Sequence, residues 1–151
     1  MSILKFVFPF LLALTFAACE KEEVLVDDPI DMSNPTLPSG VFQVNRAGLF
    51  QEQNGYTAEG TAQLGTDDAN NQWLRFAPDF RASLSTGAVT VYLSKNQNLA
   101  LNSAGSFLRV SLVTKPGEHF YKIDPAVGTD FKFAILWCAS ASVQFGNAEL
   151  N

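Results

Sequence analysis

The sequence predicts an all-β protein, an antiparallel β-sandwich or partly closed barrel of about eight to ten short strands. Three observations predict this fold. Apolar and polar residues alternate with a period of two in successive short segments. Turn-forming residues separate these segments, and no stretch after Ser39 shows a sustained helical period. Antiparallel sheets of this kind bury one face and leave the other in water.

Four segments show the alternation in chain order. Residues 57–64 and 89–94 place small or branched apolar side chains at every second position, and residues 108–112 and 142–145 repeat the pattern. Residues 131–138 differ, because they are apolar on both faces apart from one lysine. That composition is typical of a central strand that is covered on both sides.

Turn chemistry falls between these segments. Glycine, asparagine, aspartate and proline favour the tight turns that join antiparallel strands. They occur here at Asn54-Gly55, Asp67-Asp68, Thr86-Gly87, Pro116-Gly117 and Gly128.

Residues 1–18 have the organisation of an export signal. Lys5 supplies the positive charge, and residues 6–18 are almost wholly apolar. The apolar run is too short to cross a bilayer, which needs about 20 such residues. We therefore expect residues 1–18 to be a cleaved signal peptide.

The end of this signal resembles the lipobox of bacterial lipoproteins. Ala17 and Ala18 directly precede Cys19, although Phe16 stands where leucine is usual. The resemblance implies that Cys19 becomes the lipid-bearing first residue and anchors the protein to a membrane. The alternative is an ordinary secretory signal in which the cysteine is incidental.

The residues after Cys19 predict a tether. Residues 20–23 resemble the lysine-acidic-acidic signal that directs Bacteroidetes-type lipoproteins to the outer face of the outer membrane, and a charged start of a linker is the alternative. Surface display is favoured over a periplasmic orientation. Residues 19–39 are acidic and rich in proline, so they cannot bury enough apolar surface to fold alone. Residues 40–151 then form a single β-domain.

Charge and cysteine content narrow the function of residues 40–151. This segment holds eight bases and nine acids and is therefore nearly neutral. No basic stripe exists that would neutralise phosphates, which argues against a nucleic-acid partner. With Cys19 assigned to lipid, Cys138 has no cysteine with which to form an internal disulfide, and stability must come from packing.

Several motifs occur in order along residues 40–151: Gly60-Thr61-Ala62, Leu74-Arg75-Phe76, Asp79-Phe80, residues 87–94, Tyr121, and residues 131–150 with the sequence FKFAILWCASASVQFGNAEL. Together they resemble the DM-thirteen domain of Skeletor-like proteins, a domain that also accompanies DOMON domains. The resemblance covers nearly all of residues 40–151, with a departure at Ala88 and Val89, where that family usually has proline and aspartate.

The resemblance implies electron transfer or redox chemistry at Cys138. A cysteine reacts as its thiolate, and a free thiol has a pKa of about 8.5 unless a cation, a helix N-terminus or a metal lowers it. The neighbours of Cys138 in sequence are apolar, so a buried hydrophobic role is the alternative. Without a second thiol, redox turnover would need another envelope redox protein as partner.

A second functional hypothesis is a non-catalytic surface module that binds a protein or glycan. Its contacts would be loops and exposed aromatic residues such as Trp73 or Tyr92. The hypothesis involves no enzyme activity and no cofactor.

Other candidate residues favour structural roles. His119 is the only histidine and follows a Pro-Gly turn, so an exposed turn histidine is favoured over a catalytic one. The cluster Asp67-Asp68-Ala69-Asn70-Asn71 offers oxygen ligands for calcium but lacks the glycine and the downstream glutamate of an EF-hand loop. A polar hairpin is favoured there, and no catalytic, cofactor or metal residue is assigned.

Overall fold

The fold is all-β, as predicted. The computed structural model describes residues 37–85 and 89–151, and within them it contains ten strands and no helix. The predicted signal peptide and Cys19 lie outside the described residues. The strands are β1 (Gln43–Glu52), β2 (Ala58–Glu59), β3 (Thr61–Thr66), β4 (Gln72–Phe76), β5 (Arg81–Ala82), β6 (Val89–Ser94), β7 (Phe107–Val113), β8 (His119–Ile123), β9 (Phe133–Cys138) and β10 (Val143–Glu149).

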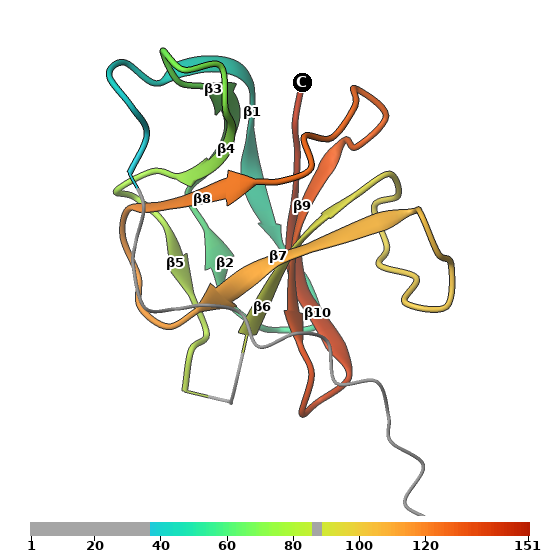
Figure 1. Ribbon diagram of the computed structural model, residues 1–151. Helices are drawn as coiled ribbons and strands as arrows, with labels where there is room; N and C mark the ends of the chain where they lie inside the picture. The colour runs from blue at the N-terminus through green and yellow to red at the C-terminus, as the bar shows by residue number, and fades with distance from the viewer. Residues whose placement is uncertain (1–36, 86–88) are drawn as a thin grey trace, which may run out of the picture.

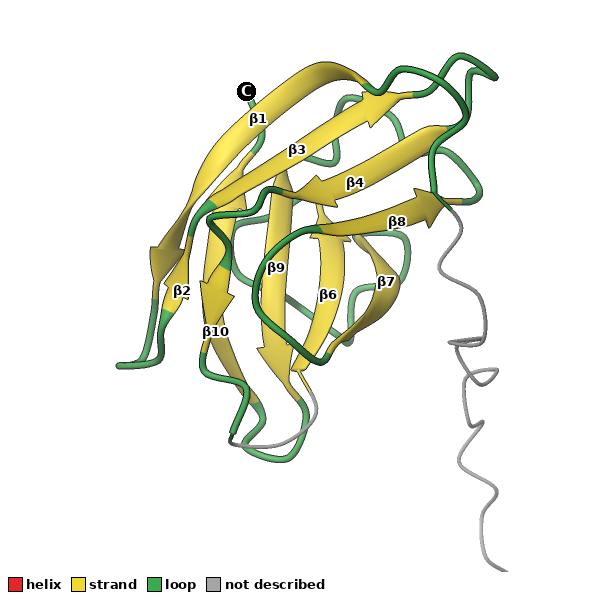
Figure 2. Ribbon diagram, turned by 90° about the vertical axis from the view of Figure 1, so that its left-hand side faces the viewer, coloured by secondary structure: helices red, strands yellow, loops and turns green. Residues whose placement is uncertain are grey.

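Eight of these strands form one curled antiparallel sheet. Its order is β7-β6-β9-β10-β1-β3-β4-β8, and β2 pairs separately with β5. The edge strands β7 and β8 lie next to each other, so the sheet is a nearly closed barrel (Figures 1 and 2). No helix in the described ranges is long and apolar enough to cross a membrane.

The barrel interior is filled by alternate residues of each strand. Fully buried side chains such as Leu74, Val91 and Leu136 point inward from three different strands. Burying a side chain of this size contributes roughly 1.5–3 kcal/mol. Phe76 lies at the centre of an aromatic cluster, with ring centroids 5.2 Å from Phe50 and 4.5 Å from Phe80. Stability therefore comes from packing, which the absence of a second cysteine in this domain required.

β9 is a central strand, as its two apolar faces predicted. It lies between β6 and β10, and Ala134, Ile135 and Leu136 have no exposed surface. Ile135 is buried without belonging to the core cluster, so it lies on the outer side of the sheet. On the neighbouring strand β10, the Gln144 side chain binds the backbone of the loop 95–106 between β6 and β7.

Gln144 holds the loop 95–106 through the oxygen and the nitrogen of its side-chain amide. Leu99 N donates to Gln144 Oε1 at 3.0 Å, and Gln144 Nε2 donates to the Gln97 carbonyl at 2.9 Å. Gln144 itself is only 6% exposed. The loop 95–106 is thus attached to the sheet at β10, beside β9, and Phe133 and Trp137 of β9 remain partly exposed.

β1 joins the two halves of the barrel. Residues 43–49 pair with β3, and residues 50–52 pair with β10. The two backbones approach so closely that a Cβ on Gly48 would overlap the Glu149 carbonyl. Only glycine fits at this crossing, where β1 passes from one half of the sheet to the other.

A bulge in β1 turns one charged residue toward the barrel. The register with β3 shifts between Val44 and Arg46, and Arg46 then pairs with Leu64, whose side chain lies in the core. Such a bulge redirects side chains next to it. Arg46 consequently lies at the end of the barrel instead of on its outer surface.

Candidate functional site

Cys138 lies inside the barrel and is not exposed. It is the last residue of β9, it pairs with Val89 and Val143, and it belongs to the hydrophobic core. The exposed fraction of Cys138 is 0%, and its Sγ lies 3.2 Å from Ser140 Oγ. This position matches the buried hydrophobic role that was the alternative to redox chemistry.

The two aromatic residues expected to be exposed are buried, so that prediction is wrong. Trp73 is 2% exposed and its Nε1 donates to Asp67 Oδ2 at 2.9 Å. Tyr92 is 8% exposed and its ring lies edge-on to Phe107 at 5.8 Å. Neither side chain belongs to the core cluster. Asp67 joins Trp73 to Ser39 in the segment before β1, and Phe107 packs on Tyr92.

His119 is the first residue of β8 and is half-buried, so the prediction of an exposed turn histidine is also wrong. Its ring stacks on Tyr121 with centroids 5.7 Å apart. Its Nε2 lies 2.8 Å from the Lys115 carbonyl, and since a carbonyl only accepts, Nε2 must donate. These contacts give His119 a structural role.

Asp67 and Asp68 form the polar hairpin that was predicted, between β3 and β4. Asp67 is 6% exposed and accepts hydrogen bonds from Ser39 N, from Asn71 N and Nδ2, and from Trp73 Nε1. Asp68 accepts one from Val41 N. Within residues 37–85 and 89–151, no group of three histidine, cysteine or acidic side chains could hold a metal. Through the hydrogen bonds from Ser39 N and Val41 N, Asp67 and Asp68 hold the segment before β1 against this hairpin.

The environment of Asp67 controls its ionisation. Burial would raise the pKa of this carboxyl, but the hydrogen bonds from Ser39, Asn71 and Trp73 outweigh burial and hold the pKa well below its usual range. Asp67 is therefore ionised at neutral pH and stabilises the hairpin as a charged acceptor.

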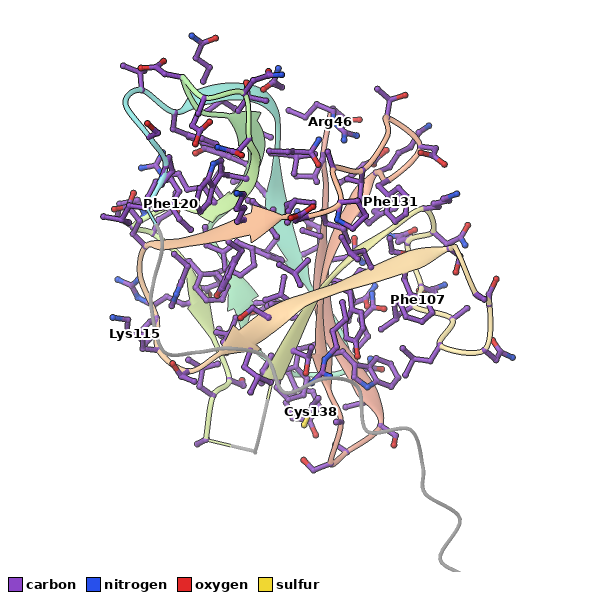
Figure 3. The ribbon with its side chains drawn as sticks, in the orientation of Figure 1. Arg46, Phe107, Lys115, Phe120, Phe131 and Cys138 are labelled. Atoms are coloured by element: carbon purple, nitrogen blue, oxygen red, sulfur yellow. The ribbon has the colours of Figure 1, made fainter. Side chains whose placement is uncertain are left out.

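A cavity of about 170 Å³ opens at the end of the barrel, and sequence reasoning did not predict it. It lies between the bulge of β1, the ends of β3 and β4, and the loop that precedes β9. Figure 3 shows Arg46 at this end and Cys138 at the opposite end of β9. The lining includes Arg46, Leu64, Thr66, Gln72, Val127 and Gly128.

Hydrogen bonds fix one wall of this barrel-end cavity. Gln72 Nε2 donates to the Val127 carbonyl at 3.1 Å, and Val127 N donates to Gln72 Oε1 at 2.8 Å. Arg46 Nη1 donates to the carbonyls of Thr129 at 3.3 Å and Phe131 at 2.8 Å. Two side chains thus hold the loop 124–131 against the barrel, and the wall is already formed without a ligand.

Arg46 is a half-buried cation at this wall. Burial lowers the pKa of Arg46 and the charge of Asp130 raises it. Asp130 forms its ion pair with Lys95, whose Nζ lies 2.8 Å from Oδ2. Within the described part of the chain, Arg46 has no ion pair of its own, and it binds only backbone carbonyls.

The signal for this site in the sequence is weak. Arg46 and Gln72 are isolated polar residues, 26 positions apart, in segments without a recognisable motif. Only the bulge in β1 and the return of the loop 124–131 bring them together.

Comparison with protein-family models, curated protein sequences and solved structures gives no match to this chain. The resemblance to the DM-thirteen domain therefore depends on the residues quoted above.

The Asp67 hydrogen bonds predict an acid-sensitive hairpin. A carboxyl with a depressed folded-state pKa contributes stability that is present above its unfolded pKa of about 3.9 and is lost as the pH falls toward the folded value. Asp67→Asn should lower the melting temperature by several degrees at pH 7. The difference in melting temperature between Asp67→Asn and the natural protein should become smaller below about pH 4, as measured by thermal unfolding at a series of pH values.

Asp68→Asn is the matched control, because Asp68 is exposed and accepts a hydrogen bond from Val41 N. It should shift the melting temperature much less. An equal effect of both substitutions at every pH would contradict the role assigned to Asp67.

Proposed function

We propose that this chain is a lipid-anchored protein of the bacterial envelope whose β-domain is a non-catalytic binding module. The observation that carries the proposal is the preformed cavity at the end of the barrel, with Arg46 and Gln72 fixing its wall. Ligand sites are concave and mostly apolar, with few polar groups that orient the ligand.

The size of the cavity limits what enters it. Its volume of about 170 Å³ is similar to that of cavities of about 150 Å³ that admit benzene. The ligand is therefore a compact molecule, or the compact end of a larger one. A surface-displayed module would meet such a ligand outside the outer membrane.

The anchor is supported by the sequence of the signal, in which Ala17 and Ala18 precede Cys19. Several acyl chains on one cysteine give stable attachment, whereas one chain gives only marginal binding. Residues 20–23, a lysine among three glutamates, support display on the outer face of the outer membrane.

Cys19→Ser should abolish lipid attachment. The full chain expressed in a bacterium with lipoprotein processing should incorporate labelled palmitate and fractionate with the outer membrane, and the variant should do neither. Cys138→Ala is the control that removes the other cysteine and should retain both properties. Palmitate incorporation by Cys19→Ser would refute the anchor.

Filling the cavity should prevent binding. Benzyl alcohol is a suitable neutral probe, and its addition should shift NMR signals of residues around the cavity. Thr66→Ile adds bulk to the lining and should weaken this binding at least several-fold. Thr114→Ile, an exposed change beyond β7, is the control and should leave binding unchanged. If Thr66→Ile and Thr114→Ile bind benzyl alcohol equally well, the cavity is not the binding site.

A second candidate function is redox chemistry at Cys138 with another envelope redox protein. Two observations favour it. Ser140 Oγ lies 3.2 Å from Sγ and would stabilise a thiolate by donating to it, and Cys138 directly precedes the exposed turn 139–142. Against it, the thiol has no exposed surface, and burial in the core disfavours the charged form.

Thiol labelling separates the two candidates. If the domain is a binding module, native Cys138 should react with iodoacetamide near neutral pH at least about 100-fold more slowly than in urea, because reaction requires local opening. Ala139→Cys in a Cys138→Ala background supplies an exposed thiol one position away and should react rapidly. Rapid labelling of native Cys138 would favour the redox candidate.

A further inference from the structure

We infer that the barrel-end cavity takes a compact hydrocarbon group, one that carries no charge and places no hydrogen-bonding atom against the floor of the cavity. The inference rests on the proposed binding function and names the chemical class of its ligand. It follows from the surface that the cavity presents, from the hydrogen bonds that already occupy its polar side chains, and from the change in its lining between floor and mouth.

The surface that the cavity presents is almost wholly apolar. Arginine, glutamine and threonine contribute to the lining, yet hardly any of the accessible surface belongs to nitrogen or oxygen atoms. An arginine meets both conditions when its methylene stem faces the cavity and its charged end does not. The Nη1 atom of Arg46 in fact binds the carbonyls of Thr129 and Phe131. Arg46 therefore provides apolar surface here, and its guanidinium is not a contact of the ligand.

The amide of Gln72 is occupied as well. Its Nε2 donates to the Val127 carbonyl at 3.1 Å, and its Oε1 accepts from Val127 N at 2.8 Å. Both polar ends of this side chain are thus bonded to the backbone before a ligand arrives. A ligand that placed a donor or an acceptor inside the cavity would lose its hydrogen bonds to water without an accessible partner in the lining, which is costly.

The lining changes from an apolar floor to an exposed mouth. Leu64 belongs to the hydrophobic core and is 2% exposed, whereas Asn45, Gly128 and Thr129 are exposed. A ligand can therefore keep a polar group in water at the mouth, provided that its apolar part enters first. The volume of about 170 Å³ suits a group of about six carbon atoms, the size of a benzene ring.

Benzene and pyrazine test the inference on the natural protein, because they have nearly the same shape and are both uncharged at pH 7. Pyrazine carries nitrogen atoms at opposite ends of its ring, so at least one of them lies inside the cavity in every orientation. Both probes should be titrated and followed by NMR signals of the residues that line the cavity. Benzene should bind at least about ten-fold more tightly, since a nitrogen acceptor loses its hydrogen bonds to water on entry.

Benzyl alcohol tests the direction of entry. Its hydroxyl group is at one end of the molecule and can remain in water at the mouth while the ring enters. It should therefore bind more tightly than pyrazine, although both carry polar atoms. Weaker binding of benzyl alcohol than of pyrazine would contradict an apolar floor beneath a polar mouth.

The outcomes distinguish the inference from the function on which it rests. If pyrazine binds the cavity as tightly as benzene or more tightly, the binding function stands and the hydrocarbon inference is overturned. If none of the three probes binds, the cavity is not a site and both fail.

A substitution in the lining assigns the preference to the cavity. Val127→Thr replaces a methyl group by a hydroxyl group at nearly constant shape, and the backbone atoms that bind Gln72 remain. It should lower the preference for benzene over pyrazine several-fold, because pyrazine gains a donor inside the cavity. Val110→Thr is the matched control, since Val110 is partly exposed on β7 and does not line the cavity. Equal preferences in the two variants would contradict the inference.

Arg46→Met tests the role assigned to the arginine stem. Methionine keeps an unbranched apolar chain and removes the guanidinium, so the preference for benzene over pyrazine should stay as it is in the natural protein. A preference that moved toward pyrazine or away from it by ten-fold would show that the guanidinium meets the ligand and would overturn the inference. Should Arg46→Met fail to fold, the Val127→Thr and Val110→Thr pair still decides the outcome.

Discussion

The close approach of the β1 and β10 backbones is the contact on which the barrel depends. β1 pairs with β3 along one part of its length and with β10 along the other, so in the order of the described sheet it links the four strands β7-β6-β9-β10 to the three strands β3-β4-β8. Gly48 permits this link because a side chain there would overlap the Glu149 carbonyl. Gly146 has the same constraint on β10, where a Cβ would meet the Gln51 carbonyl at 2.6 Å. Closure of the sheet thus requires two positions without side chains.

Closure also creates the ligand-sized space at one end. The register of β1 with β3 shifts at the bulge, and the loop 124–131 lies against Arg46 at this end of the barrel. Because Arg46 and Gln72 bind backbone groups of this loop, the opening becomes a cavity with a fixed wall. The opposite end, near Cys138, is filled by core side chains and leaves the thiol without solvent. The two ends of one barrel therefore differ in chemistry.

The period-two alternation of residues 57–64, 89–94 and 108–112 correctly indicated strands, because inward and outward positions differ in burial along a half-covered sheet. The same reasoning failed for Trp73 and Tyr92. An outward position was assumed to be exposed, but Asp67 joins Trp73 to the chain before β1, and Phe107 packs on Tyr92. Such contacts join different segments, so the alternation within one segment does not reveal them.

The sequence by itself determined the all-β class, the central place of β9 and the polar hairpin at Asp67, because each depends on local alternation, composition or turn chemistry. Only the tertiary structure decided that the sheet closes into a barrel and that Arg46 turns toward its open end. Both depend on contacts between residues distant along the chain, and the bulge that redirects Arg46 depends on the register with β3. A local pattern contains no information on register, so the cavity could be found only in the folded chain.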